Sequence, residues 1–343
     1  IRDQPRSRGL GDVYKRQVVG IGNAIVDIIL SVQDGFIKLH GLEKGSMFLA
    51  DHKKTEEILK SISPVMQTAG GSAANTVFGL SQLGCKGAFI GKRSNDDIGD
   101  FFSSDLEASN IYFKTKPMLN KDPSGRCLIL VTPDAERTMV TFLGSSIYLS
   151  TEDIDENIIK DSKIVYLEGY LFDLPEAQRA FKQAAKSAHS LESLVAFSLS
   201  DSFCVDRHRE EMKKFILNDV NILLCNEAEI LSLYELDSVQ ECISALRRDV
   251  DIAVITMGEK GAKIVDKNDV YEISAFPTSV VDTTGAGDFF AAGFLAGLSK
   301  NFSLKNAGVL GSACSAEIIS HYGARPEISL EKFIQRFDFH NNM

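Results

Sequence analysis

The sequence predicts an α/β protein with a doubly wound, mostly parallel β-sheet, helices on both faces, and a small β-sheet lid. Three observations support this prediction. Strand-like and helical runs alternate between residues 164 and 257, as they do in parallel sheets whose strands are joined by helices. Several strand-like runs without intervening helices lie within residues 111–147 and indicate a separate small sheet. The composition, 44% hydrophobic and 24% charged, is ordinary for a globular protein.

The first predicted element is a buried strand over residues 18–30 (VVGIGNAIVDIIL). The GIG tripeptide within it begins like a dinucleotide-binding fingerprint. Ile25 stands where that fingerprint needs its third glycine, so the fingerprint is excluded. Asn23 and Asp27 lie near the end of the strand, where open α/β sheets bind ligands. Residues 33–51 mix glycine, charged and apolar residues and predict a short hairpin or flap.

The remaining elements follow from periodicity and from glycine, proline and capping signals. Helices are predicted over residues 53–62, 70–83, 97–109, 175–190, 207–218, 227–234, 238–248, 303–320 and 329–337. Strands are predicted over residues 89–91, 112–116, 126–132, 137–143, 164–168, 194–199, 221–225, 252–257, 261–266 and 270–274. Val280 and Val281 indicate the end of a further strand, which a glycine-rich turn joins to a helix of small residues.

Residues 18–338 are predicted to form one domain, with lid segments at about 31–51 and 111–147. Residues 1–17 carry five Arg or Lys and two Asp without an apolar core. This composition excludes a signal peptide and indicates a non-native or disordered tail, with a short transit peptide as the alternative. Residues 339–343 are expected to be a C-terminal tail.

The bulk charge limits the partners of the protein. A net charge of -10 argues against nucleic acid or an anionic membrane surface as a partner. No apolar run approaches the roughly 20 residues of a membrane span. The six cysteines are scattered, which is typical of reduced thiols in a cytoplasmic protein. The six histidines include no HxxxH pair, so a metal site built on them is not expected.

The glycine-rich turn from Asp282 to Asp288 predicts an anion site. Glycine allows backbone conformations in which successive N–H groups point at one anion. The helix that follows adds its positive N-terminal dipole. Asp288 is a carboxylate within this turn and is therefore a candidate base beside a bound phosphate. An ordinary helix N-terminus with a capping aspartate is the alternative.

A second turn of similar construction opens the helix predicted at residues 70–83. Gly70 and Gly71 precede Ser72, and Asn75 follows one turn into the helix. The likeness to the first turn favours a binding site over a plain turn. Neither a P-loop (GxxxxGK[ST]) nor the protein-kinase motif set occurs in the sequence, so those two kinds of phosphate site are excluded.

Together, GGSAAN at 70–75 and DTTGAGD at 282–288 closely resemble the two signatures of the PfkB (ribokinase-like) kinases. NEAE at 226–229 matches the NxxE pattern of that family, and ITMGEKGA at 255–262 resembles its nucleotide-binding turn. The resemblance covers residues 18 to about 338, with the motifs in the family's order. It implies a ribokinase-like fold and a single kinase domain that transfers phosphate from ATP to an alcohol group.

The resemblance also implies roles in catalysis. Asp288 would take the proton of a substrate hydroxyl, as a general base. The amides of the turn would hold the phosphoryl oxygens; these residues are Gly285, Ala286 and Gly287. Arg137, which follows a turn in the lid region, is a candidate to neutralise phosphate on closure, with a solvated turn arginine as the alternative.

On the donor side, the resemblance implies Mg²⁺ organised through water by Asn226 and Glu229. The nucleotide would lie against residues near the matching turn and the last helices, with the segment from Ala313 to Arg325 closing its adenine side; the predicted contacts are Asn226, Thr256, Gly258, Gly261 and Ala313. Asp282 matches a family position for a monovalent cation such as K⁺, and a plain helix-entry carboxylate is the alternative.

On the acceptor side, several positions match those that hold sugar hydroxyls: Asn23, Asp27, Gly70, Gly71, Ser72 and Asn75. Within the family the chain is most similar to adenosine kinases. Met47 and Leu49 occupy flap positions that cover a nucleoside, and Tyr170 and Phe203 fall near places where aromatic side chains sandwich the purine. Thr284 stands where animal-type adenosine kinases place an asparagine near the base.

These matches predict phosphorylation of a primary hydroxyl of a ribose-containing substrate, most directly the 5′-OH of adenosine to give AMP. A ribokinase- or fructokinase-type sugar kinase is one alternative, which polar groups around the acceptor would favour. A catalytically silent nucleotide- or sugar-binding protein is another, and Asp288 beside a complete Gly-Ala-Gly turn argues against it. The expected partners are ATP and a small molecule; monomer and homodimer both stay open.

Overall fold

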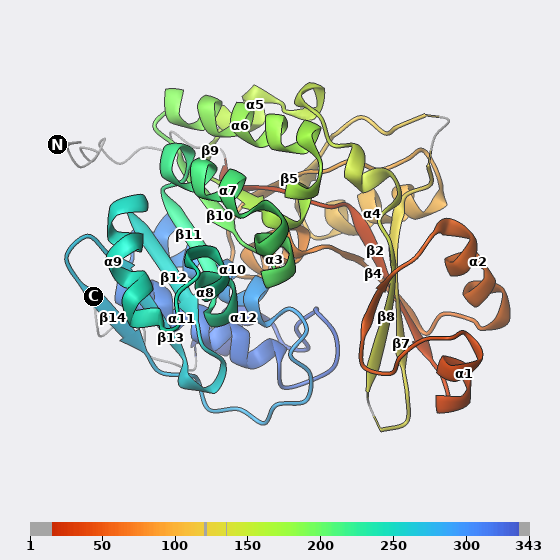
Figure 1. The fold of residues 1–343 in the computed structure, drawn as a ribbon. Coiled ribbons are helices and arrows are strands. Elements are labelled where there is room, and N and C mark those ends of the chain that lie inside the picture. Colours follow the sequence, from red (N-terminus) through yellow and green to blue (C-terminus); the bar gives the residue numbers. More distant parts are fainter. Residues whose placement is uncertain (1–15, 120–121, 135, 336–343) are drawn as a thin grey trace.

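The computed structural model describes residues 16–119, 122–134 and 136–335 (Figure 1). Two β-sheets form the frame, one of nine strands and one of five. In Figure 1 the large sheet and its helices lie to the left, and the small sheet stands off to the right. The predicted fold class is confirmed. No helix in the described ranges is long and apolar enough to cross a membrane.

The large sheet runs in the order β14-β13-β12-β11-β10-β9-β1-β5-β6. The pairs from β6 to β12 are parallel, and β13 and β14 add an antiparallel edge. Its strands are β1 (Arg16–Ile21), β5 (Gly87–Ile90), β6 (Tyr112–Phe113), β9 (Ser162–Glu168), β10 (Leu194–Ser198), β11 (Ile222–Asn226), β12 (Ile252–Thr256), β13 (Ala262–Asp266) and β14 (Val270–Ile273). Parallel strands that helices cover on both faces read as continuous apolar runs, as these do.

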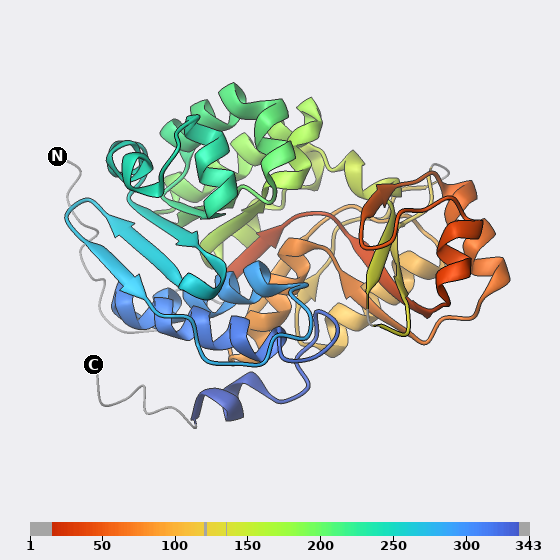
Figure 2. The ribbon, with the colours of Figure 1, turned by 60° about the horizontal axis from the view of Figure 1, so that its bottom comes forward.

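Helices pack on both faces of the large sheet (Figure 2). One layer contains α5 (Glu156–Lys160), α6 (Pro175–Ser190), α7 (Ser202–Asp219), α8 (Glu227–Tyr234) and α9 (Val239–Asp249). The opposite layer contains α3 (Ser72–Gln82), α10 (Ala286–Ser299) and α11 (Leu304–Ile318), with α12 (Leu330–Gln335) beside α11. α10 is buried from Phe289 to Gly297 because the sheet, α3 and α11 surround it. A side chain at Gly293 would press on the α11 backbone.

The small sheet runs in the order β3-β8-β7-β2-β4. Its strands are β2 (Ile25–Ser31), β3 (Met47–Leu49), β4 (Met66–Gly70), β7 (Gly125–Val131) and β8 (Arg137–Phe142). α2 (His52–Ser61) and α4 (Asp97–Ala108) pack against this sheet, and α1 (Asp34–Leu39) lies between β2 and β3 in the chain. Side chains on the sheet face toward the large domain, among them Ile25 and Cys127, line a cavity.

The strand predicted over residues 18–30 is in fact two strands in two sheets. β1 ends at Ile21 and β2 begins at Ile25, and the residues between them cross from one sheet to the other. The crossing is tight, because a side chain at Gly22 would collide with the Glu168 carboxylate. Asn23 therefore lies at the junction of the two sheets.

Other local predictions are also wrong. Tyr112–Phe113 pairs with β5 in the large sheet, so the run at 112–116 is no part of the small sheet. Residues 33–51, predicted as a short hairpin or flap, contain a short helix and one strand, so the hairpin alternative is wrong. Residues 280–281 form no strand, and β4 was not predicted, because its short polar sequence MQTAG resembles a loop. Helix α7 begins earlier than predicted, because the Asp201 side chain caps the N–H of Cys204.

The chain ends bear on the predicted tails. Arg16 and Gln17 belong to β1, so the prediction of a tail over residues 1–17 is wrong at these two positions. Residues 1–15 and the tail predicted at 339–343 lie outside the described residues, as do positions 336–338 at the predicted end of the domain.

Candidate active site

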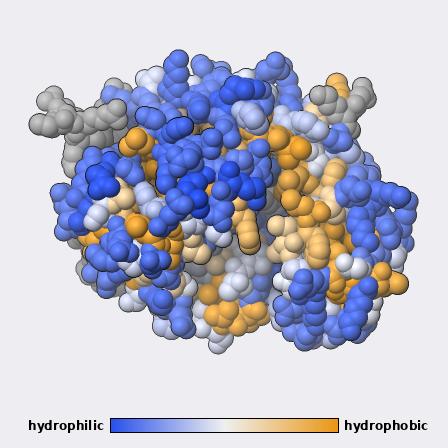
Figure 3. Space-filling model, in the orientation of Figure 1, coloured by the Kyte–Doolittle hydropathy of each residue, from blue (hydrophilic) through white to orange (hydrophobic). Residues whose placement is uncertain are grey.

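A cavity of about 1170 Å³ lies between the carboxyl ends of the large-sheet strands and the inner face of the small sheet. Glu168, Ser198, Asn226 and Thr256 line it from the ends of β9, β10, β11 and β12. Figure 3 shows the surface hollowed between the two parts, with hydrophobic groups along the small-sheet side. Because typical ligand pockets measure about 300–1,000 Å³, this cavity has room for two small substrates.

Helix α10 begins at this cavity with an open N-terminus. Gly285 adopts a φ of 79°, in the left-handed region that favours glycine. No side chain of the described residues caps this helix, and Gly285, Ala286 and Gly287 all line the cavity. The Ala286 N–H donates to the Thr283 carbonyl at 3.1 Å, so it is less available than its neighbours. The open amides and the helix dipole together make a site for an anion.

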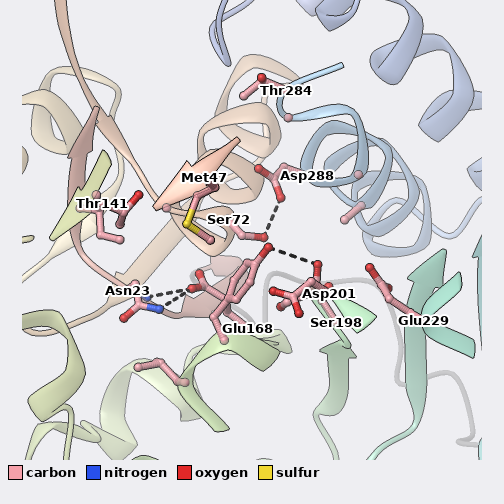
Figure 4. Close-up of a pocket in the computed structure, with 18 of the residues that line it drawn as sticks. Asn23, Met47, Ser72, Thr141, Glu168, Ser198, Asp201, Glu229, Thr284 and Asp288 are labelled. Atoms are coloured by element: carbon pink, nitrogen blue, oxygen red, sulfur yellow. Dashed lines mark hydrogen bonds between the residues drawn. The ribbon is translucent and has the colours of Figure 1, made fainter. Parts of the chain in front are cut away.

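Asp288 lies in the first turn of α10 and lines the cavity. Ser72 Oγ donates to its Oδ1 at 2.6 Å and Asn75 Nδ2 donates to its Oδ2 at 3.1 Å. Figure 4 shows Asp288 and Ser72 pointing toward one another. Burial raises the pKa of Asp288 from 3.8 to about 6, against the opposing effect of the two hydrogen bonds and of the Arg325 charge. The carboxylate is therefore mostly ionised above pH 6, and its two hydrogen bonds hold it in a fixed orientation. Asn75 lies behind Asp288, outside the cavity lining.

Helix α3 begins opposite, and a carboxylate of the protein itself occupies its N-terminus. The Ala73 N–H donates to Glu168 Oε2 at 2.8 Å, and Asn23 Nδ2 donates to Glu168 Oε1 at 2.8 Å (Figure 4). Burial raises the pKa of Glu168 from 4.5 to about 7, while these hydrogen bonds lower it. Gly71, with a φ of 94°, passes so close to the Asn23 carbonyl that any side chain would collide with it.

Asp27 projects from β2 into the same cavity. Desolvation raises its pKa from 3.8 to about 7; the Arg325 charge lowers it and the Asp288 charge raises it. A side chain at Gly70 would collide with the Asp27 carboxylate. Gly70 therefore shapes the wall behind Asp27 and does not itself line the cavity.

The predicted base pocket is brought together from both sheets. Met47 and Leu49 of β3 line the cavity from the lid, and Tyr170 and Phe203 line it from the main domain. All four are substantially exposed; Phe203, in the first turn of α7, is 72% exposed. The hydroxyl of Tyr170 donates to the Ser200 carbonyl at 3.3 Å. Exposed hydrophobic side chains that face one cavity offer a surface for an apolar, flat ligand.

The residues predicted to contact the nucleotide and its Mg²⁺ separate into two groups. Asn226, Glu229 and Thr256 line the cavity, whereas Gly258, Gly261 and Ala313 do not. Gly261 has a φ of 85° and a side chain there would collide with the Ile273 carbonyl, so this glycine shapes the β12–β13 turn. Ala313 is fully buried within α11. In this structure Gly261 and Ala313 therefore have roles in the turn and in helix packing, and neither faces the cavity.

Asn226 and Glu229 form a reciprocal cap at the start of α8. Asn226 Oδ1 accepts from the Glu229 N–H at 2.8 Å, and the Glu229 carboxylate accepts from the N–H and the Nδ2 of Asn226. Burial raises the pKa of Glu229 from 4.5 to about 7. No cluster of three potential His, Cys, Asp or Glu metal ligands occurs in the described ranges. These oxygens, each already accepting a hydrogen bond, fit Mg²⁺ that keeps its water shell.

Arg137 and Asp282 bind each other. Arg137 Nη1 lies 2.7 Å from Asp282 Oδ2, and both side chains are 9% exposed. Asp282 also accepts from the N–H and hydroxyl of Thr284 and from the Gly323 N–H. A carboxylate neutralised by a guanidinium is a poor cation ligand, so this geometry disfavours the K⁺ role predicted for Asp282. Arg137, which lines no part of the cavity, joins β8 of the lid to the loop before α10.

Sequence reasoning missed two residues with direct contacts to this site. Glu168 stands at the carboxyl end of a predicted parallel strand, which is a position where ligand-binding side chains gather, so a signal was available. Arg325, from the segment after α11, donates to Asn75 Oδ1 at 3.3 Å. The sequence offered no signal for Arg325 beyond its place in the predicted adenine-side segment.

Solved structures share this architecture along nearly the whole chain. A probable sugar kinase from Rhizobium etli CFN 42 is 38% identical, with a TM-score of 0.87 over 95% of this chain and 99% of that one. An adenosine kinase from Sinorhizobium meliloti is also 38% identical, with a TM-score of 0.86 over 94% of this chain and 99% of that one. The protein is therefore of the phosphotransferase class that uses an alcohol group as acceptor.

The chain belongs to the pfkB family of carbohydrate kinases, whose family model matches residues 46–331. The resemblance drawn from the two glycine-rich motifs is thus confirmed, and with it the ribokinase-like fold. An uncharacterized sugar kinase of Archaeoglobus fulgidus is 28% identical over 72% of this chain and 96% of its own length. Membership in this kinase family implies ATP as the phosphate donor.

Proposed function

We propose that this protein transfers the γ-phosphoryl group of ATP to the 5′-hydroxyl of adenosine, which yields AMP. One observation supports the chemistry above all others: Asp288, oriented by Ser72, lies beside the uncapped N-terminus of α10 in one cavity with Asp27. Phosphoryl transfer to a hydroxyl uses a base and groups that stabilise the phosphoryl charge, and a second carboxylate can bind the hydroxyls of the acceptor. A role in purine salvage in the cytoplasm is part of this proposal.

In the proposed reaction Asp288 accepts the proton of the attacking hydroxyl. Its pKa of about 6 leaves it ionised near neutral pH and close enough to that pH to work as a base, which is typically worth about 10²–10⁴-fold in rate. Ser72 and Asn75 hold both carboxylate oxygens, so the carboxylate meets the hydroxyl in a fixed orientation. The open amides at Gly285 and Gly287 stabilise the charge that develops on the phosphoryl oxygens.

Mg²⁺, when bound, would neutralise charge on the donor phosphates. Asn226 and Glu229 would hold it through water, since their own hydrogen bonds already fix their oxygens at the start of α8. Thr256, at the end of β12, would contact the nucleotide on the same side of the cavity.

The acceptor would lie on the small-sheet side. Asp27 and Asn23 offer a carboxylate and an amide to ribose hydroxyls, and a buried polar group left without its hydroxyl would discriminate strongly against the wrong sugar. The hydrophobic lid residues Met47 and Leu49, with Tyr170 and Phe203 across the cavity, would enclose a purine. This apolar wall favours a nucleoside over a free sugar, which has no flat apolar part.

A free sugar as acceptor is the second candidate, because relatives at 28% and 38% identity are named sugar kinases. The deciding experiment measures ADP release from MgATP with adenosine, inosine, guanosine, ribose and fructose, and identifies each product by mass spectrometry. We expect the highest kcat/KM with adenosine and a product with the mass of AMP. Turnover with fructose or ribose and none with adenosine would overturn the nucleoside assignment and leave the phosphotransfer intact.

A further inference from the structure

Arg325 is a partly buried cation behind the cavity that touches four groups at once. Its Nη1 donates to Asn75 Oδ1 at 3.3 Å, and its Nη2 lies 3.3 Å from Asp105 Oδ2 and donates to the Ala69 carbonyl. The guanidinium stacks over the Phe78 ring, 3.9 Å from its centroid. Arg325 is not among the residues that line the cavity, so it acts on the site through the residues it holds and through its charge.

The contact with Asn75 decides which way the Asn75 amide points. A guanidinium only donates hydrogen bonds, so it selects the Asn75 oxygen. The amide nitrogen is then left to face Asp288, where Nδ2 donates to Oδ2 at 3.1 Å. With the amide reversed, its oxygen would face the carboxylate and repel it. Arg325, Asn75 and Asp288 therefore form one directional chain of hydrogen bonds.

The contacts with Ala69 and Asp105 fix the strand that leads into α3. Asp105 Oδ2 accepts from the Ala69 N–H at 2.8 Å, while Arg325 Nη2 donates to the carbonyl of the same residue. Both polar groups of Ala69 are thus held by the Arg325–Asp105 pair. Ala69 pairs with Val26 in the small sheet, next to Asp27, and it precedes Gly70 and the start of α3. The pair therefore joins the lid strand, α4 and the C-terminal segment at the acceptor end of the cavity.

We propose that Arg325 is a positioning residue of the phosphoryl transfer, which orients Asp288 through Asn75 and supplies a positive charge behind Asp288 and Asp27. The inference rests on the proposed role of Asp288. The charge of Arg325 lowers the pKa of both carboxyl groups, against the larger effect of desolvation. The titratable or charged groups that face Asp288 besides Arg325 are Asp27, Tyr166, Glu168 and Tyr170; Arg137 also faces Asp27.

The test compares kcat as a function of pH in wild type, Arg325→Gln and Arg325→Lys. We expect Arg325→Gln to lower kcat at least about 10-fold at neutral pH. The acid limb, which is the part of the profile where kcat falls at low pH, should move up by roughly 1 pH unit, because an opposite charge nearby depresses a carboxyl pKa by about that much. Arg325→Lys keeps the charge but loses the planar set of N–H donors that the guanidinium provides. We therefore expect the acid limb near that of wild type and kcat only partly restored. The KM for ATP should stay within about twofold in both.

Arg209→Gln is the matched control. Arg209 of α7 donates to the Ser232 carbonyl of α8 and pairs with Asp206 of α7 and with Glu235, which follows α8. It lines no part of the cavity. Its loss should lower thermal stability without moving the acid limb. If Arg325→Gln behaves in the same way, with a lower midpoint of unfolding and an unchanged pH profile, Arg325 is merely structural and the proposal is overturned.

A second measurement needs no turnover. Without the Arg325 charge the buried carboxyl groups hold their protons to higher pH in the folded state, so the unfolding free energy of Arg325→Gln should fall more steeply with rising pH than that of wild type. Identical slopes would contradict the charge effect. Asp288→Asn, assayed in parallel, separates the two ideas. Full activity of Asp288→Asn would overturn the base assignment, whereas its inactivity beside a wild-type profile for Arg325→Gln would overturn only the inference.

Discussion

The starts of α3 and α10 are built alike and used in opposite ways. Each follows a glycine with positive φ, at Gly71 and Gly285, and each continues in small residues that let the two helices pack together. Both starts meet the same cavity. At α3 the Ala73 N–H is taken by the buried Glu168 carboxylate. At α10 no described side chain serves as a cap.

The difference shows that a glycine-rich helix start is an anion site only if the protein leaves it open. The dipole of α3 stabilises the Glu168 carboxylate, which in turn holds Asn23 in place. The positive end of α3 therefore stabilises the fold and is not available to a ligand. The α10 dipole stays available for a ligand. Asp288, in the first turn of α10, lines the same cavity as this open helix start. The following predictions test this division, from the largest expected effect to the smallest.

Asp288→Asn removes the proposed base at the open helix start and keeps the side-chain shape. We expect kcat to fall at least about 10²-fold with little change in either KM, since the lost proton acceptor matters in the transition state. Steady-state kinetics at pH 7.5 checks this. In wild type, kcat should decline as the pH falls through about 6, the pKa of Asp288. A near-normal kcat in the variant would remove Asp288 from this role.

Gly285→Ala and Gly71→Ala compare the two turns directly. At Gly71 a methyl group collides with the Asn23 carbonyl, so we expect a loss of roughly 3 kcal/mol in unfolding free energy. At Gly285 the methyl group would lie 3.2 Å from Ala324 Cβ, so we expect about 1 kcal/mol from the positive φ. The shifted amides should still lower kcat by about 10-fold. Chemical denaturation and steady-state kinetics on both variants test this difference. Equal losses of stability and of kcat in the two variants would contradict the distinction between an open and a closed helix start.

Glu168→Gln removes the charge from the closed helix start. The pKa of Glu168 is raised from 4.5 to about 7 in the folded protein, so the folded state holds this proton more tightly than the unfolded state does. The stability from that proton is fully present below pH 4.5 and is lost as the pH rises through 7. For a group that is 1% exposed, this amounts to about 3 kcal/mol. Urea denaturation from pH 5 to 8 should therefore show a shallower decline in the variant than in wild type.

Thr284→Val should have the smallest effect. The Thr284 hydroxyl donates to Asp282 Oδ1 at 2.8 Å, and the Thr284 N–H donates to the same oxygen. Loss of the hydroxyl costs about 1 kcal/mol of stability and should change the KM for adenosine by less than about twofold. A KM raised 10-fold would mean that the hydroxyl contacts the acceptor base, as the sequence comparison with adenosine kinases implied.

The sequence predicted the motif-bearing elements well and the lid less well. Local patterns located α3, α10 and the large-sheet strands, because alternating apolar runs and glycine turns are encoded over short stretches. They failed at residues 18–30, where one apolar run serves two sheets, and at β4, whose polar residues pair only because β2 lies beside them. The family resemblance implies nucleotide contacts for Gly261 and Ala313, and only the tertiary structure shows that Gly261 shapes a turn and that Ala313 is buried within α11.

The sequence by itself determined the fold class and the two glycine-rich turns, and it identified Asp288 as the candidate base. Only the tertiary structure decided which turn stays open, since the carboxylate that closes α3 comes from β9, some distance away in the chain. It likewise paired Arg137 with Asp282 and placed Arg325 behind Asn75. The physical reason is that burial and long-range pairing set the charge and orientation of a side chain, and neither is encoded in its immediate neighbours.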